Sequence, residues 1–458
     1  MNFRILRIEL RRSLAPWAGL AVLAIALAYL LLIPGPWQQD GARWTAQWTS
    51  MALWTRYPLF FLLPLAVGLG ALQGLRDPRA KMAELLASTP RPARHRASVL
   101  GGATGLALVS GFALVVLLGA VLVLRGDATY HHPGWLPISL IGAFALVAGA
   151  VLGMGVARAV PSALTPPVLA VGGLVLGFLL RQTSDTALPQ STAPNPLSLL
   201  SPAVAEVREP LLTLTGPVHL GQALWLLGMA VTGLALLAAA TARTRLLALA
   251  PLVAGGVVAL LVLPSAPRGT YVIDRAAAAQ VCDGPVCVTR AHEGRLGALA
   301  GPGRETLRVL RLALGDRAPR VIHETVVPRG SFGKVDRAPG VLLVDFDDRA
   351  IGGAEGKTLT RALVGQGMAP LCGARSATES GAVEEAAAQS IGAAWVLGGL
   401  KPLDGTMHDA RSQGEKAVPA WQKLTALPRP EQQKRIDAMH AAAVSCSGDA
   451  LTALGGVK

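Results

Sequence analysis

The amino-acid sequence predicts an α-helical integral membrane bundle of about seven transmembrane helices, followed by a soluble α+β extracytoplasmic domain. Three observations predict this class: long windows without a charged residue, a one-sided distribution of the remaining Lys and Arg, and a C-terminal part that holds all four cysteines. We expect the transmembrane domain to span residues 1–264 and the extracytoplasmic domain to span residues 265–458.

Seven windows without Asp, Glu, Lys or Arg fill most of the first 267 residues. Each is long enough for an apolar helix, rising about 1.5 Å per residue, to cross a hydrocarbon core of ~30 Å. The composition agrees, because 52% of the residues are hydrophobic and only 15% are charged. The windows cover residues 13–39, 57–75, 97–124, 128–157, 159–180, 210–242 and 246–267.

The charges between the windows orient the bundle, because Lys and Arg accumulate in short cytoplasmic loops. With the N-terminus inside, the cytoplasmic segments hold thirteen basic and three acidic residues, and the opposite loops hold five of each. The outer set is Arg43, Arg56, Arg125, Arg181 and Arg208 against Asp40, Asp127, Asp185, Glu206 and Glu209. Seven crossings then place the C-terminal domain outside. We expect a multi-pass protein of the cell membrane with a cytoplasmic N-terminus.

The net charge of +14 follows from this topology. The transmembrane part supplies ten of these charges through its basic cytoplasmic loops, and the C-terminal part supplies four. The lipid bilayer is therefore the expected partner, and a nucleic-acid partner is not needed to explain the basic charge. Tryptophans gather around the first outer loop, where residues 41–52 fit either a short helix on the outer surface or an irregular loop anchored by Trp.

A short amphipathic helix is predicted between the second and third windows, within residues 76–91. Pro78 suits the first turn of a helix, the following residues favour helix, and Pro90 ends it. Met82, Leu85 and Leu86 fall on one face, so the segment presents an apolar stripe on the cytoplasmic side. An ordinary solvated loop is the alternative interpretation.

This segment carries the stretch Glu84-Leu85-Leu86-Ala87-Ser88-Thr89-Pro90. With it, the chain resembles the permease subunits of type-2 ABC exporters, whose loop after the second helix has a Glu-Leu-Leu-x-Ser-Thr-Pro stretch after an acidic and basic run. Residues 3–12 resemble the amphipathic N-terminal elbow helix of that family, with Arg7, Glu9 and Arg11 as its charged residues. The resemblance covers roughly residues 1–245.

The resemblance implies the membrane-spanning subunit of an ATP-driven exporter that moves an unknown substrate. It implies that residues 76–91 form a coupling helix that docks on a separate ATPase subunit, which brings ATP and Mg. It also implies a second copy of the chain or a sister permease. The residues expected at the ATPase contact are Arg76, Asp77, Arg79, Lys81, Glu84, Leu85 and Leu86. The family core has six crossings, so the seventh crossing and the C-terminal domain go beyond what the resemblance covers.

No ATP-binding motif is found in this chain. The nearest stretch, residues 352–358, lacks the first Gly of G-x-x-x-x-G-K-T because residue 351 is Ile. We therefore expect a transport subunit that is not itself an enzyme and holds no cofactor. The apolar windows offer almost no ionisable residue, which favours an apolar or amphipathic substrate over proton-coupled transport.

The sequence of the C-terminal domain predicts an α+β fold, and the domain is large enough to bury its own core. Residues rich in Val and Ile predict strands at 286–289, 321–327 and 341–346. Helical patterns follow at residues 304–314, 357–365, 379–398 and 430–446.

All four cysteines lie in this domain, which the topology places in an oxidising compartment. Cys282 and Cys287 flank a turn, so a local disulfide is expected, which leaves Cys372 to pair with Cys446. Free or metal-bound thiols are the alternative, although no C-x-x-C spacing is present.

Two His-Glu pairs, His292-Glu293 and His323-Glu324, suggest a metallopeptidase. The motif H-E-x-x-H fails, however, because residue 296 is Leu, and we expect structural histidines and no metal site. Asp345, Asp347 and Asp348 likewise fit a solvated turn better than a catalytic set. The competing function is a membrane-anchored extracytoplasmic enzyme or sensor, for which one or two helices would suffice.

The charge asymmetry gives a direct test of orientation. A membrane-impermeant thiol reagent applied to intact cells should label a cysteine introduced by Gly414→Cys and should not label one introduced by Ala93→Cys. Labelling measured by mass shift of the purified chain checks this, and the reverse pattern would mean that the orientation is wrong.

Overall fold

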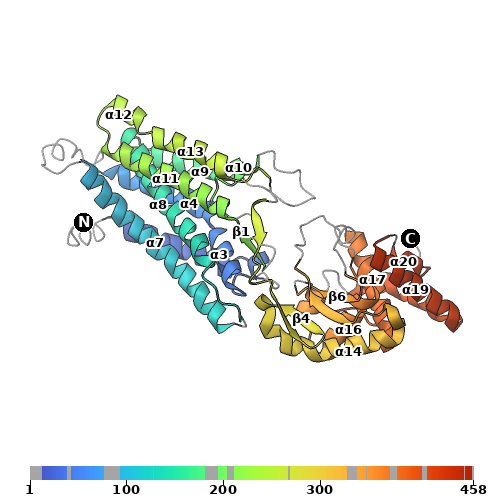
Figure 1. Cartoon of the computed structure of the whole chain (residues 1–458). Helices are drawn as coiled ribbons and strands as arrows, with labels where there is room; N and C mark the ends of the chain where they lie inside the picture. Colours follow the sequence, from blue (N-terminus) through green and yellow to red (C-terminus); the bar gives the residue numbers. More distant parts are fainter. Residues whose placement is uncertain are drawn as a thin grey trace. The chain divides into compact units, whose positions relative to one another are not determined.

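The computed structural model describes residues 13–38, 43–76, 93–126, 128–180, 194–203, 211–266, 269–326, 338–346, 348–371, 379–404, 410–447 and 449–455. The chain forms two compact units (Figure 1). The N-terminal unit comprises residues 1–127 and 131–272, and the C-terminal unit comprises residues 128–130 and 273–458.

Helices dominate the described part of the N-terminal unit, where two short strands also pair. The apolar windows form these helices because a backbone in lipid must satisfy its own hydrogen bonds. The elements are α2 (Ala15–Leu32), η1 (Pro36–Gln38), α3 (Trp48–Arg56), α4 (Leu59–Gly74), α7 (Ala93–Arg125), α8 (Trp135–Ala159), α9 (Thr165–Leu180), α10 (Asn195–Ser198), β1 (Leu212–Leu214), α11 (Gly216–Ala238), α12 (Ala242–Leu247), α13 (Ala250–Val262) and β2 (Tyr271–Ile273).

Five helical segments in the described ranges are long and apolar enough to cross a membrane: α2, most of α7, α8, α11, and α12 together with α13. A sixth span exists if α3 and α4, bent by 48°, count as one. The seven charge-free windows of the sequence predicted seven membrane crossings. The difference arises at 57–75 and 159–180, where α4 and α9 are each only 16 residues long. Multi-pass membrane helices are therefore supported, with a smaller set of full-length spans.

Helix α8 lies at the centre of the N-terminal unit, with its most extensive contacts to α4 and α11 (Figure 1). Small residues allow these helices to approach backbone to backbone. A Cβ atom added at Gly153 of α8 would collide with the carbonyl oxygen of Val67 in α4. One added at Gly233 of α11 would collide with the carbonyl oxygen of Val151 in α8. Glycine at both positions thus fixes the spacing of the three helices.

Helix α3 is buried within the unit, so residues 48–52 do not form the expected helix on the outer surface, while residues 43–47 before it are irregular. Every residue from Trp48 to Arg56 is buried. The Trp48 indole Nε1 donates a hydrogen bond to His131 Nδ1 at 2.8 Å. The Trp48 ring stacks on the Trp135 ring, with 5.5 Å between their centroids. These partners lie at the start of α8, and they hold α3 inside the unit.

The chain that leaves α13 is tied back onto the N-terminal unit. Asn195 Nδ2 donates to the Pro264 carbonyl at 2.7 Å. The Thr215 amide donates to the Thr270 carbonyl at 3.1 Å, and β1 pairs with β2. Residues up to the start of β2 are therefore anchored beside the first turn of α11.

The C-terminal unit contains a four-stranded sheet in the order β3-β4-β5-β6. Strand β4 is antiparallel to β3 and parallel to β5, and β5 is parallel to β6. The elements are β3 (Gln280–Asp283), β4 (Val286–Thr289), η3 (Arg290–Arg295), α14 (Leu296–Leu314), η4 (Gly315–Arg317), β5 (Val321–Glu324), β6 (Val341–Val344), α15 (Arg349–Gly352), α16 (Gly356–Met368), α17 (Glu379–Leu397), α18 (Ala410–Thr425), α19 (Arg429–Ser445) and α20 (Ala450–Ala453).

The apolar core of this unit lies between the sheet and its helices, where Val286, Ile322, Leu310 and Leu363 are fully buried. The three predicted strands are present, with the second and third ending at residues 324 and 344. The four predicted helices are also present, although α14 begins earlier than expected, at Leu296. Among the described elements, strand β3 and the long helix α18 were not predicted, and neither were the short helices η3, η4, α15 and α20.

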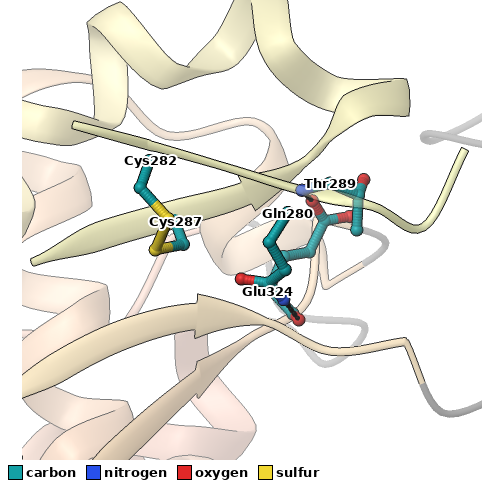
Figure 2. Close-up of a disulfide and its surroundings, with 5 residues drawn as sticks. All are labelled: Gln280, Cys282, Cys287, Thr289 and Glu324. Carbon is teal, nitrogen blue, oxygen red and sulfur yellow. Dashed lines mark hydrogen bonds between the residues drawn. A yellow bond between two sulfur atoms is a disulfide. The ribbon is translucent and has the colours of Figure 1, made fainter.

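A disulfide joins Cys282 of β3 to Cys287 of β4 across the hairpin (Figure 2). The two residues are direct antiparallel partners, with their Cα atoms 4.0 Å apart. Gly284 in the turn has φ +59°, which a glycine adopts without strain. Cys446 is also disulfide-bonded, and Cys372 lies outside the described residues.

The close approach of α4 and α8 predicts opposite effects of two glycine substitutions. Gly153→Ala should destabilise the protein by about 1–3 kcal/mol, because the methyl group forces the two backbones apart. Gly172→Ala in α9 should be neutral or slightly stabilising, since no atom beyond its chain neighbours and its own helix backbone lies within 4 Å of the added Cβ. Thermal unfolding of both variants in detergent checks this. Equal melting temperatures would contradict a fixed spacing.

Candidate functional site

Arg56 is the last residue of α3 and is 0% exposed. The sequence placed it in an outer loop, and the structure corrects this. The residue lies just before the bend into α4, which begins at Leu59 after Pro58. Because α3 turns into the unit, it carries the guanidinium into the interior with it.

The guanidinium donates hydrogen bonds to two oxygens. Nε and Nη2 donate to the Pro202 carbonyl at 2.9 and 2.6 Å, and Nη2 also donates to Gln222 Oε1 at 2.6 Å. Gln222 Nε2 in turn donates to the Leu199 and Ser201 carbonyls at 3.0 and 3.1 Å. Thus one glutamine of α11 holds both the arginine and the segment after α10.

Gly142 of α8 makes room for this side chain. A Cβ atom there would lie 3.3 Å from Arg56 Cγ and 2.7 Å from the ring of Phe112. Any larger residue would therefore displace the arginine stem or the phenylalanine. The pocket for Arg56 is built by α3, α8, α11 and the segment after α10.

The arginine has no acidic partner within the described ranges. Nε and Nη2 donate only to neutral oxygens. Nη1 is buried and has no hydrogen-bond acceptor in the described residues. His219 lies one turn before Gln222 on α11, and its buried Nδ1 likewise lacks a partner in the described part. Arg56 interacts electrostatically with both His219 and Tyr271 of β2. We name Arg56, His219, Gln222 and Tyr271 the Arg56 centre.

The Arg56 centre was not predicted from the sequence, for a physical reason. The predicted window began at residue 57, so Arg56 counted as a loop charge, and Gln222 and His219 fell inside the window 210–242 as isolated polar residues. One signal was present: Arg56 follows the run Met51-Ala52-Leu53-Trp54, which has no other charge. Intramembrane ionisable residues mark functional sites by default.

A second polar cluster lies in the C-terminal unit, at the carboxyl ends of β4 and β5. His292 Nδ1 lies 2.6 Å from Glu324 Oε1, and Glu324 Oε2 accepts the Thr289 amide at 2.7 Å. Figure 2 shows Thr289 and Glu324 facing each other across the two strands. The Glu324 side chain is only 4% exposed, so it is a buried carboxylate with two donors.

This cluster takes one residue from each predicted His-Glu pair. His292 comes from the first and Glu324 from the second, while Glu293 is exposed and His323 is half-buried. The His292 ring also lies 5.2 Å from the ring of Phe346, which follows β6. The cluster therefore fastens the ends of three neighbouring strands.

The structure gives no support for a metal or nucleotide site here. No group of three His, Cys, Asp or Glu residues in the described ranges is arranged to hold a metal ion. Asp348 belongs to a turn, where its Oδ1 accepts the Ala350 amide at 3.0 Å, and Asp347 lies outside the described residues. The stretch 352–358 joins the end of α15 to the start of α16, so it does not link a strand to a helix.

The residues predicted to contact an ATPase lie mostly outside the described part of the chain. Arg76, just after α4, is described and exposed. The others, and the elbow residues, are not described: Asp77, Arg79, Lys81, Glu84, Leu85, Leu86, Arg7, Glu9 and Arg11.

Comparison with known proteins adds no relative. No family model, no curated protein and no solved structure matches the chain.

The buried carboxylate of Glu324 predicts a local stability effect. Glu324→Ala should lower the opening free energy of β4 and β5 by roughly 2–4 kcal/mol, since the Thr289 amide loses its buried acceptor and His292 loses its partner. Hydrogen–deuterium exchange of the full chain, read on peptides from these strands, measures it. Glu305→Ala is the control, because Glu305 pairs with Arg308 at the surface. Equal exchange in both variants would contradict the role of Glu324.

Proposed function

We propose that the chain is the membrane-spanning subunit of an ATP-driven exporter and works with a separate ATPase subunit. One observation supports this most: the stretch Glu84 to Pro90, which resembles the coupling segment of type-2 ABC permeases, lies in the connection between two bundle helices. That connection, residues 77–92, joins α4 to α7.

The packing around these two helices supports a mechanical role for the connection. Helix α4 packs most extensively on α8, and α7 packs on α2. Gly153 and Gly70 bring α4 and α8 into backbone contact, and Gly111 does the same for α2 and α7. A displacement of residues 77–92 by a bound ATPase would therefore move two tightly packed helix pairs. Such coupled motion is what a two-state transporter driven by ATP requires.

The proposed topology has seven crossings, with the N-terminus in the cytoplasm and the C-terminal unit outside. It counts α3 with α4 as one bent span and α9 as a short span. In the proposed working unit, two membrane subunits, either two copies or one copy with a sister permease, meet two ATPase subunits. The otherwise apolar bundle suits an amphipathic substrate.

The proposal predicts that the chain co-purifies from native membranes with an ATPase, and that the contact depends on Glu84 and Leu85. Replacing both residues with Lys should abolish recovery of the ATPase, because two added cations reverse the charge and remove apolar surface of the docking segment. Affinity capture followed by an ATP-hydrolysis assay measures both recovery and coupling.

The matched control is the pair Glu415→Lys and Val418→Lys in α18, which makes the same exchange at two exposed positions of the C-terminal unit. This variant should retain the ATPase like the unchanged chain. A pull-down that recovers no ATPase with the unchanged chain would sink the proposal.

A further inference from the structure

Arg56 is a permanent cation enclosed in an apolar bundle. A guanidinium does not deprotonate in proteins, so burial cannot remove its charge. Moving a charged side chain into a low-dielectric interior costs several kcal/mol unless a counter-charge or a complete set of hydrogen bonds replaces water. The proposed coupling to an ATPase through residues 77–92 gives no role to the buried Arg56.

The hydrogen bonds of Arg56 are incomplete. The guanidinium has five N–H donors, and its three hydrogen bonds within the described residues engage only Nε and Nη2. Both donors of Nη1 lack an acceptor in the described part of the chain, although the atom is buried. An unsatisfied buried donor in a native structure points to a water, ion or ligand that completes it. Here the donor is also charged, which favours an anion over water.

His219, which lies near Arg56 in the Arg56 centre, can also donate a hydrogen bond to an anion. His219 Nδ1 is buried without a partner in the described residues, and it donates a proton in one neutral tautomer and in the charged form. The phenol of Tyr271 lies within electrostatic range of the guanidinium. These groups come from α3, α11 and β2. Tyr271 makes a further interaction of its own, so the donors left for a ligand are those of Arg56 and His219. Donors on two separate helices suit a group with several oxygens in different directions, such as a phosphate, better than the planar pair of a carboxylate.

We propose that the Arg56 centre binds a phosphate group, with Nη1 of Arg56 as the principal donor and His219 as the second. The phosphate is carried either by an anionic lipid headgroup or by a free phosphate ion. Both supply the same oxygens and the same negative charge. This inference stands independently of the exporter proposal, because it uses only the contacts of Arg56.

The test uses the full chain in neutral detergent and two probes, inorganic phosphate and phosphatidylglycerol. Ligand binding to the native state raises the melting temperature, so thermal unfolding reports binding, and native mass spectrometry counts retained lipid. Sodium chloride at matched ionic strength and phosphatidylcholine are the reference additions. A shift with inorganic phosphate identifies the free ion, and a shift with phosphatidylglycerol alone identifies the lipid headgroup.

Variants test whether probe binding depends on Arg56. Arg56→Gln should weaken probe binding by roughly tenfold or more, since it removes a charge-assisted bond. Arg56→Lys keeps the charge without the guanidinium and should bind with intermediate affinity. Arg125→Gln changes an exposed arginine at the end of α7 and should bind like the unchanged chain.

Two outcomes would overturn the inference. One is that neither probe raises the melting temperature of the unchanged chain above its reference addition, which would leave water as the partner of Nη1. The other is that Arg56→Gln binds the probe as tightly as the unchanged chain. If Arg56→Gln does not fold, Arg56→Lys and His219→Phe give the same decision, because undiminished binding by both excludes the centre.

Discussion

The close approach of α4 and α8 is the contact on which the N-terminal unit depends. Glycines at this contact leave no space for side chains between the two backbones, so the axial position of α4 is fixed against α8. The bend before α4 then determines where α3 goes, and α3 determines the depth of Arg56. The burial of Arg56 is thus a consequence of helix packing at Val67 and Gly70, about three to four helical turns further along the chain.

In the C-terminal unit, stabilising contacts lie at the ends of short strands. Its parallel strands β4 and β5 are short, with four residues each, and their carboxyl ends bring polar groups together. The carboxylate of Glu324 accepts a backbone amide of one strand and contacts the imidazole that follows it. The hairpin of β3 and β4 is fastened at its other end by the Cys282–Cys287 disulfide (Figure 2). A covalent bond and a buried polar cluster therefore stabilise opposite ends of strand β4.

Sequence alone predicted what depends on neighbouring residues and missed what depends on distant ones. Apolar helices, three strands and the local disulfide follow from composition, periodicity and a turn. Helix α18 was missed because Gly414 and Pro419 interrupt a polar stretch that reads as a loop. His292 and Glu324 are separated by 32 positions, and only the crossover through α14 brings them together. Burial of Arg56 was missed because periodicity cannot report that a helix bends inward after a loop.

The anchored chain between α13 and β2 has a consequence for how mechanical load reaches the bundle. The chain connects the two units at residues 127–128, 130–131 and 272–273. At the last of these connections it leaves through β2, next to Thr270, whose carbonyl accepts the amide of Thr215, the residue that precedes α11. Tension along this last connection would be borne first by the β1–β2 pairing and the start of α11. That helix carries Gln222 two turns later, bonded to Arg56. A force transmitted along the chain after β2 would therefore act on the helix that holds Arg56.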